Sequence, residues 1–245
     1  MLVAPVLRLR RGWGHMKATA LITGGSGGLG TAVVAEFLGA GWRVVVPWIE
    51  EKELGRLPDG EHLETVHADL FEPESAAAAV SSAAGAPDAP LRALVNLVGG
   101  FAMAGRVHET PVEDFERQLR LNVRPAYLTA QAALPHLVAG GGGAVVLVSS
   151  RAAVRPFSGA AGYITGKAAV LALTDALAAE YTGDGVRVNA VMPSIVDTPA
   201  NRAAQPGADY SSWVAPEAIA QVIRFLCEDS SGAVSGAHIP VYGRA

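Results

Sequence analysis

Tyr163 and Lys167 are spaced four residues apart, and Ser150 precedes the tyrosine by thirteen residues. On a helix, residues at i and i+4 lie on one face, so the Lys167 ammonium can lie beside the Tyr163 phenol and favour its ionised form. The same Tyr-x-x-x-Lys spacing also occurs in helices where a surface lysine merely covers a packed tyrosine. The ordered set with Ser150 favours a chemical role over that structural one.

A phenol needs a large pKa shift to act as an acid or base near neutral pH. A free phenol has a pKa of about 10, and lowering it by roughly 3 units requires about 4 kcal/mol. A lysine at about 5 Å supplies roughly 3 kcal/mol in an effective dielectric of about 20. The cationic ring of an oxidised nicotinamide could supply much of the remainder, so the pair makes best chemical sense beside a dinucleotide.

A glycine-rich segment near the start of the chain has the spacing TGxxxGxG. Glycine allows a tight turn and lets the backbone approach a pyrophosphate at a helix N-terminus. A glycine turn that serves packing alone is the alternative, but the segment lies between a predicted strand and a predicted helix, which favours dinucleotide binding. The candidate cofactor contacts in this turn are Thr23, Gly24, Ser26, Gly28, Leu29 and Gly30.

Short apolar runs alternate with longer alanine-rich helical patterns along the chain. Strands are predicted at 20–22, 44–46, 63–67, 93–95, 144–148, 186–191 and 237–241, and helices at 30–40, 51–57, 74–84, 112–139, 159–181 and 216–229. Such alternation is typical of βαβ units and a parallel sheet that is covered on both faces. The pattern therefore predicts an α/β fold, a Rossmann-type doubly wound seven-stranded parallel sheet in three layers. The glycines at 140–143 follow a helix and precede a strand, so they predict a helix stop and a tight turn.

Composition limits the possible partners. Half of the residues are hydrophobic and 17% are charged, which is typical of a well-buried globular enzyme. The net charge is −4, and without residues 1–15, which hold three arginines and no acid, it is 16 minus 23, or −7. We therefore expect no nucleic-acid partner. Cys227 is the single cysteine, which excludes an internal disulfide and a cysteine zinc cluster and favours a reducing cytoplasm; no metal site is predicted.

Residues 1–15 differ from the rest of the chain. Their apolar run precedes the arginines, the reverse of a secretory signal, and Pro5 interrupts it. We expect a disordered tail followed by a single dinucleotide-binding catalytic domain at 16–245, with a transit peptide as the alternative for the tail. Elsewhere no stretch reaches the roughly 20 apolar residues needed to cross a bilayer, so no membrane partner is expected.

In their order, these motifs resemble the single-domain branch of the short-chain dehydrogenase/reductase family. The resemblance extends from about Lys17 to the end of the chain. Its marks are the glycine turn at 23–30, Asp69-Leu70, the NLVG segment at 96–99, Asn122, Ser150, the pair Tyr163 and Lys167, the NAVMP segment at 189–193 and the SGAHIPV segment at 235–241.

The resemblance implies an enzyme that transfers hydride between NAD or NADP and a small carbonyl or secondary alcohol substrate. Tyr163 would exchange a proton with the substrate oxygen as general acid or base, and Ser150 would hydrogen-bond that oxygen. Lys167 would also bind the nicotinamide ribose, and Asn122 would hold a water that links Lys167 to solvent. Ser149 is the alternative to Ser150, and a plain surface asparagine is the alternative for Asn122.

The same resemblance places further residues against the cofactor. Asp69 would hydrogen-bond the adenine amino group, Leu70 would contribute a backbone contact, and Asn96 would steady the central strand. For Asp69, an ordinary turn or helix-cap role is the alternative. The remaining candidate cofactor contacts lie at strand ends and in the loop after the sixth strand: Gly99, Pro193, Val196 and Thr198.

The choice between NAD and NADP departs from the family pattern. Trp48 stands at the end of the second strand, where many NAD-using relatives have an acid, and its alternative role is packing. Gly27 and Ile49 stand where an arginine or lysine would pair with a 2′-phosphate. Glu50 and Glu51 would repel such a phosphate, so we favour NAD.

A substrate lid is expected over about residues 198–214. Arg151 could bind an anionic substrate or point into solvent. The candidate substrate contacts, on the lid and on other loops at the same strand ends, are Phe101, Arg151, Phe157, Tyr210 and Trp213.

Two further expectations concern class and assembly. A non-catalytic dinucleotide-binding or scaffold protein on the same fold is the main alternative function, because a fold alone does not establish catalysis. It would have no need to keep Ser150, Tyr163 and Lys167 together. The resemblance also implies a homotetramer or homodimer, formed by the two long helices and the region of the last strand.

Overall fold

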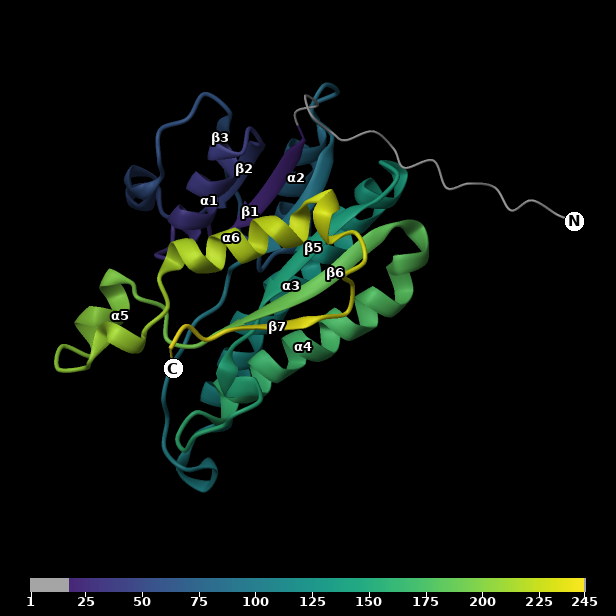
Figure 1. The fold of residues 1–245 in the computed structure, drawn as a ribbon. Helices are drawn as coiled ribbons and strands as arrows, with labels where there is room; N and C mark the ends of the chain where they lie inside the picture. The colour runs from purple at the N-terminus through teal and green to yellow at the C-terminus, as the bar shows by residue number, and fades with distance from the viewer. Residues whose placement is uncertain (1–17, 245) are drawn as a thin grey trace, which may run out of the picture.

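Seven parallel strands form one sheet in the computed structural model, which describes residues 18–244 (Figure 1). The predicted tail at 1–15 lies outside the described residues. The sheet confirms the predicted fold class. The strands are β1 (Thr19–Thr23), β2 (Arg43–Trp48), β3 (Leu63–His67), β4 (Leu91–Asn96), β5 (Gly143–Val148), β6 (Val186–Pro193) and β7 (His238–Val241).

The strand order β3-β2-β1-β4-β5-β6-β7 reverses direction once. The chain builds outward from β1 to β3 and then returns to add β4 on the other side of β1. In doubly wound sheets, ligands bind outside the carboxyl ends of the strands at such a reversal. The topology thus places the expected site beside the ends of β1 and β4.

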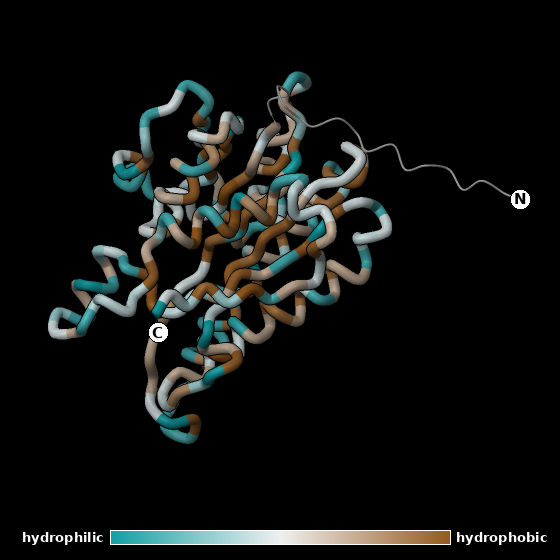
Figure 2. The backbone as a smooth tube through the Cα atoms, viewed as in Figure 1, coloured by the Kyte–Doolittle hydropathy of each residue, from teal (hydrophilic) through white to brown (hydrophobic). Residues whose placement is uncertain are grey.

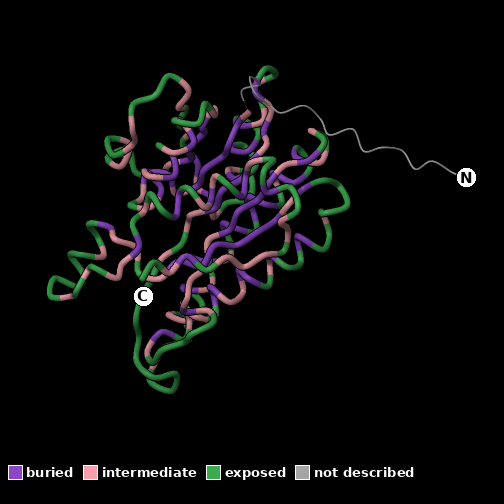
Figure 3. The backbone as a smooth tube through the Cα atoms, viewed as in Figure 1, coloured by how far each residue is buried: buried purple, intermediate pink, exposed green. Residues whose placement is uncertain are grey.

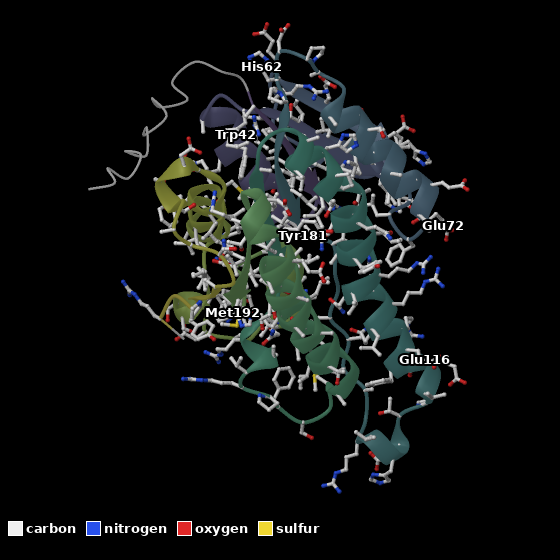
Figure 4. The ribbon with its side chains drawn as sticks, turned by 90° about the vertical axis from the view of Figure 1, so that its right-hand side faces the viewer. Trp42, His62, Glu72, Glu116, Tyr181 and Met192 are labelled. Carbon is white, nitrogen blue, oxygen red and sulfur yellow. The ribbon has the colours of Figure 1, made fainter. Side chains whose placement is uncertain are left out.

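Helices cover both faces of the sheet. Two of them, α1 and α6, pack on one face, and α2, α3 and α4 pack on the other (Figure 1). The long helices α3 and α4 lie side by side (Figure 4). The bounds are α1 (Gly30–Gly39), α2 (Pro73–Ala84), α3 (Val112–Ala139), α4 (Ala161–Tyr181), α5 (Pro199–Ala204) and α6 (Pro216–Cys227).

Apolar strand residues supply both faces of the core. In β1, Ala20 and Ile22 pack toward α1 and α6, whereas Leu21 packs toward the other three helices. All three are fully buried. The strands therefore run as brown, buried segments through the middle of the molecule (Figures 2 and 3). Burial on both faces explains why these strands read as continuous apolar runs.

Several boundaries differ from the sequence prediction. The segment predicted as a helix at 51–57 is a 3-10 helix, η1 (Glu51–Arg56), and α5, within the predicted lid at 198–214, was not predicted. Helix α4 begins at Ala161 instead of 159, because Gly159 has a φ of +85°, which no right-handed helix accommodates. Helix α6 ends at Cys227 instead of 229, because Glu228 is extended.

The predicted helix stop and turn at 140–143 is confirmed. Helix α3 ends at Ala139, and Gly141 and Gly142 have φ values of +82° and +110° before β5 begins. Within residues 18–244, no helix combines the length and apolar character that a membrane crossing requires.

Candidate active site

The glycine turn after β1 leaves an open cradle at the N-terminus of α1. Gly24 has a φ of +67°, and a Cβ on Gly30 would lie 2.1 Å from the Gly24 carbonyl oxygen. A Cβ on Gly28 would lie 2.9 Å from the side chain of Thr198, which begins the lid. Only glycine fits these positions, and the backbone N–H groups of the helix start remain available for an anion. The cradle thus fits the pyrophosphate of a dinucleotide.

Two buried polar side chains join β1 to β4 beside this cradle. The Thr23 hydroxyl donates to Asn96 Oδ1 at 2.7 Å, and the Leu97 N–H reaches the Thr23 hydroxyl at 3.3 Å. Asn96 is 3% exposed. The pair holds the two central strand ends together where the topology reverses.

Ser150, Tyr163 and Lys167 lie together at the carboxyl end of β5. Ser150 caps the 3-10 helix η3 (Arg151–Ala153) and is hydrogen-bonded to Tyr163. Lys167 Nζ donates to the Val148 carbonyl at 2.9 Å and lies 6.0 Å from the centroid of the Tyr163 ring. The Ser149 hydroxyl instead donates to the backbone carbonyl of Lys167 at 2.7 Å, so it ties β5 to α4.

Burial dominates the ionisation of this cluster. It raises the pKa of Tyr163, and the hydrogen bond from Ser150 lowers that pKa in part. It also lowers the pKa of Lys167 to about 8. The expectation that Lys167 would hold the phenol pKa down is wrong for this arrangement, because desolvation of the phenolate is the larger effect.

Asn122 clamps the loop after β4 against α3. Its Oδ1 accepts from the Gly100 N–H at 3.1 Å, and its Nδ2 donates to the carbonyls of Gly100 and Gln118, both at 3.0 Å. A Cβ on Gly99 would lie 2.7 Å from Asn122 Oδ1 and 3.0 Å from Lys167 Nζ. Asn122 is 1% exposed, so it is not the surface asparagine that was the alternative, and Gly99 separates it from Lys167 by a short distance. Its role in holding water stays a prediction.

Because Lys167 titrates, the free energy of unfolding should increase as the pH is raised from 8 to 9. Its pKa is about 8 in the folded chain and 10.5 ordinarily, so the unfolded chain binds more protons in this interval. By linkage the free energy of unfolding then rises by about 1 kcal/mol, whereas below the folded pKa the cost of burying the ammonium is fully present.

Urea denaturation of the wild type and of Lys167→Met at pH 8 and pH 9 measures this effect. Taking the difference between the two proteins removes the contribution of other titrating groups to the free energy of unfolding. One such group is Cys227, whose pKa burial raises to about 12. Parallel pH profiles for the two proteins would contradict the proposed cost.

Two phenylalanine rings lie in a row beside the ring of Tyr163. Phe101 packs edge-on against Tyr163, with ring centroids 5.0 Å apart, and lies 6.3 Å from Phe157. A pocket of about 310 Å³ opens next to them, between residues 102–104 and the N-terminal turns of α3 and α4. A larger pocket of about 500 Å³ lies at the amino ends of the strands, away from this chemistry.

The other candidate substrate contacts belong to different surroundings. Tyr210 packs on Trp213 at 4.6 Å between centroids, and the guanidinium of Arg202 lies 4.8 Å from the Tyr210 centroid, all within the segment 198–214 that was predicted to be a lid. The guanidinium of Arg151 lies 5.7 Å from the Tyr242 centroid. Neither predicted role of Arg151, binding an anionic substrate or pointing into solvent, included this contact, because Tyr242 is far away in sequence.

The adenine side of the cradle also has defined contacts. Asp69 Oδ1 accepts from the Phe71 N–H at 2.9 Å, the turn contact that was the alternative for this residue, and Leu70 is buried. Trp48 packs edge-on against His67 with centroids 4.9 Å apart. At the opposite border, Val196 pairs with Val214, and Thr198 caps α5 through the Asn201 N–H.

Sequence reasoning missed two residues near the cradle. The Ser26 hydroxyl donates to Glu53 Oε2 at 3.1 Å, and Gly100 forms the backbone partner of Asn122. No spacing signal marks either contact, because each joins elements that meet only in the folded chain. Among the described residues, no group of three His, Cys, Asp or Glu side chains could hold a metal ion.

A family model described as short chain dehydrogenase matches residues 18–209. The chain belongs to the short-chain dehydrogenase family. This membership confirms the resemblance and makes the chain an oxidoreductase that acts on alcohol groups, in preference to the scaffold alternative.

Named relatives of this short-chain dehydrogenase include two curated enzymes. It is 35% identical to the 2-(R)-hydroxypropyl-CoM dehydrogenase of Xanthobacter autotrophicus over 195 residues, 75% of this chain and 76% of the relative. It is 33% identical to the meso-2,3-butanediol dehydrogenase of Serratia marcescens over 240 residues, 92% and 93% of the two chains. Among solved structures, ElxO with NADP bound aligns with a TM-score of 0.86 and 25% identity over 93% of this chain and 98% of that one.

Proposed function

We propose that this short-chain dehydrogenase transfers hydride between NAD and a small, uncharged carbonyl or secondary alcohol, with Tyr163 as the general acid or base. The observation that carries the proposal is the cluster of Ser150, Tyr163 and Lys167 at the end of β5, on the same edge of the sheet as the glycine cradle. A protein that only bound the dinucleotide would have no use for a half-buried phenol bonded to a serine beside a buried ammonium.

The bound nicotinamide supplies or accepts the hydride at its ring, and the protein supplies the proton and the orientation. The Ser150 hydroxyl can donate to the substrate oxygen and align the carbonyl for attack. Tyr163 then gives its proton to that oxygen in the reducing direction and takes it back in the oxidising direction. The Lys167 ammonium, 6.0 Å from the centroid of the Tyr163 ring, would attract a phenolate once it forms and so offset part of the cost of its burial.

The two directions of the reaction use different forms of Tyr163. In the reducing direction the protonated phenol donates, and burial, which raises the pKa of Tyr163, favours that form. In the oxidising direction the phenol must first ionise, and the positive charges of Lys167 and of the oxidised ring would then favour that ionisation. Water held at Asn122 is the proposed link from Lys167 to solvent.

The preference for NAD rests on charge around the end of β2. Neither Gly27 nor the exposed Ile49 carries a cation that could pair with a 2′-phosphate, and Glu50 is exposed nearby. The NADP bound to ElxO belongs to that protein and its own residues. We therefore extend the proposal to NAD as the working cofactor.

The substrate proposal rests on the rings beside Tyr163. Phe101 and Phe157 are 56% and 47% exposed, so they present apolar surface that a substrate can cover. Arg151 faces Tyr242, which favours uncharged substrates over anions. Small ketones and secondary alcohols with apolar flanks fit this surface best.

Two measurements test the proposal. Fluorescence titration with NADH and NADPH should show binding of NADH first, and a panel of ketones and secondary alcohols should then show turnover at 340 nm. Binding without turnover of any carbonyl or alcohol would contradict the proposed reaction, and failure to bind either dinucleotide would contradict the proposed site.

We further propose that the protein works as a homodimer or homotetramer through its long helices. Tyr127 on α3 is 50% exposed, a large ring on the outer face of one of the two helices expected to pair. Sedimentation velocity at micromolar concentration should give a mass above that of one chain. A single species with the mass of one chain would contradict the assembly.

A further inference from the structure

The carboxylate of Glu53 lies beside the glycine cradle, and no sequence motif indicates this contact. The Ser26 hydroxyl, in the cradle, donates to Glu53 Oε2 at 3.1 Å. Ser26 is 6% exposed and Glu53 belongs to η1, the 3-10 helix that follows β2. A buried hydroxyl thus holds the glutamate against the turn that would bind the pyrophosphate.

We propose that Glu53 selects the dinucleotide by binding the adenosine ribose, in place of the acid that is absent at Trp48. This inference rests on the proposed NAD-dependent function. The ribose of a dinucleotide lies next to the pyrophosphate, on the side of the end of β2. The Ser26 hydrogen bond tethers the Glu53 carboxylate to the glycine turn on that side, where it would be within reach of the ribose hydroxyls.

The chemistry of the two cofactors makes the carboxylate selective. An ionised carboxylate only accepts hydrogen bonds, and the two ribose hydroxyls of NAD can donate to it. The 2′-phosphate of NADP is itself an acceptor and carries negative charge, so Glu53 would repel it. The same group therefore strengthens one complex and weakens the other.

The neighbouring cation is held by this carboxylate. Arg56 Nη1 lies 3.3 Å from Glu53 Oε1, within the same short helix. Its side chain is 58% exposed, whereas that of Glu53 is 36% exposed. Loss of Glu53 would release a guanidinium next to the cradle, and a free guanidinium is a good phosphate ligand.

The structure thus assigns the two residues opposite effects on selectivity. Glu53 favours NAD directly and also keeps Arg56 occupied. Arg56 becomes available to a 2′-phosphate only when the carboxylate is removed. Lys52, the next cation along the segment, is 77% exposed and pairs with Glu50 at 3.3 Å.

Dissociation constants for NADH and NADPH, measured by nicotinamide fluorescence, test this assignment. Relative to the wild type, Glu53→Gln should weaken NADH binding by about tenfold, the effect of losing one or two charge-assisted hydrogen bonds. It should tighten NADPH binding by several-fold. The double variant Glu53→Gln with Arg56→Gln should lose the gain for NADPH while it keeps the loss for NADH.

Glu61→Gln is the matched control, because Glu61 is an exposed glutamate that precedes β3, at the edge of the sheet opposite the cradle. It should leave both dissociation constants within about twofold. Thermal unfolding of each variant shows that the fold is retained.

The outcomes separate the two proposals. If Glu53→Gln binds dinucleotide with an unchanged ratio of NADH to NADPH affinity, the assignment of Glu53 is overturned and the proposed function stands. If the wild type binds neither dinucleotide, the proposed function falls, and the assignment falls with it.

Discussion

Replacing Tyr163 with phenylalanine should lower kcat by about a thousandfold, within the range that general acid–base catalysis contributes. The substitution removes only the hydroxyl that is hydrogen-bonded to Ser150 and leaves the ring that packs against Phe101. NADH binding should therefore stay within about twofold, because the cradle lies on other residues. Steady-state turnover and fluorescence titration measure the two effects separately.

Tyr181→Phe is the control for this variant. Tyr181 is also a partly buried tyrosine and ends the same helix, α4, away from the cluster (Figure 4). It should keep wild-type turnover. Retained turnover in Tyr163→Phe would reject the phenol as the proton donor, and loss of NADH binding in that variant would show that the tyrosine serves the cofactor instead.

Gly30→Ala should weaken NADH binding by roughly 10- to 100-fold, as expected when overpacking of about 1–3 kcal/mol distorts the turn. The new Cβ would lie 2.1 Å from the Gly24 carbonyl oxygen and 2.7 Å from backbone atoms of Gly25. Backbone atoms cannot rotate away as a flexible side chain can. The turn itself must move, and the cradle for the pyrophosphate moves with it.

Gly39→Ala provides a matched control at the other end of α1. A Cβ there meets no atom within 4 Å. Because alanine is the better helix former, this variant should be more stable by about 0.5–1 kcal/mol and bind NADH as the wild type does. Titration and urea denaturation of both variants measure the contrast. Equal NADH affinity in Gly30→Ala would contradict the role of the cradle.

Local patterns identified much of the architecture. All seven strands were predicted, most clearly the inner ones, because a strand buried on both faces needs continuous apolar residues. The edge strand β3 has no buried residue and no continuous apolar run. The spacing from Ser150 to Lys167 predicted that both would lie near Tyr163, since the residues share one strand end and one helix. Errors arose where the chain is irregular. The positive φ of Gly159 makes α4 begin two residues later than predicted. The 3-10 helix η1 is only six residues long, so its sequence pattern cannot be told from that of a short α-helix.

Charge effects in the cluster were harder to predict. Spacing alone indicated that Lys167 lies beside Tyr163, and it led to the expectation of a lowered phenol pKa. The structure shows that burial acts in the opposite direction on the same phenol. Desolvation depends on every group that covers a side chain, and for Tyr163 these groups include Phe101 and Ser150, which lie in the loops after β4 and β5.

The sequence by itself determined the fold class, the order of the motifs and the chemical types at the site, because these depend on residues close together in the chain. Only the tertiary structure decided which distant residues meet: Ser26 with Glu53, Gly100 with Asn122, and Arg151 with Tyr242. Each of these contacts depends on how the loops at the carboxyl ends of the strands pack against other parts of the chain. Spacing along the chain carries no record of that packing, so the cofactor selectivity proposed for Glu53 becomes visible only in the folded protein.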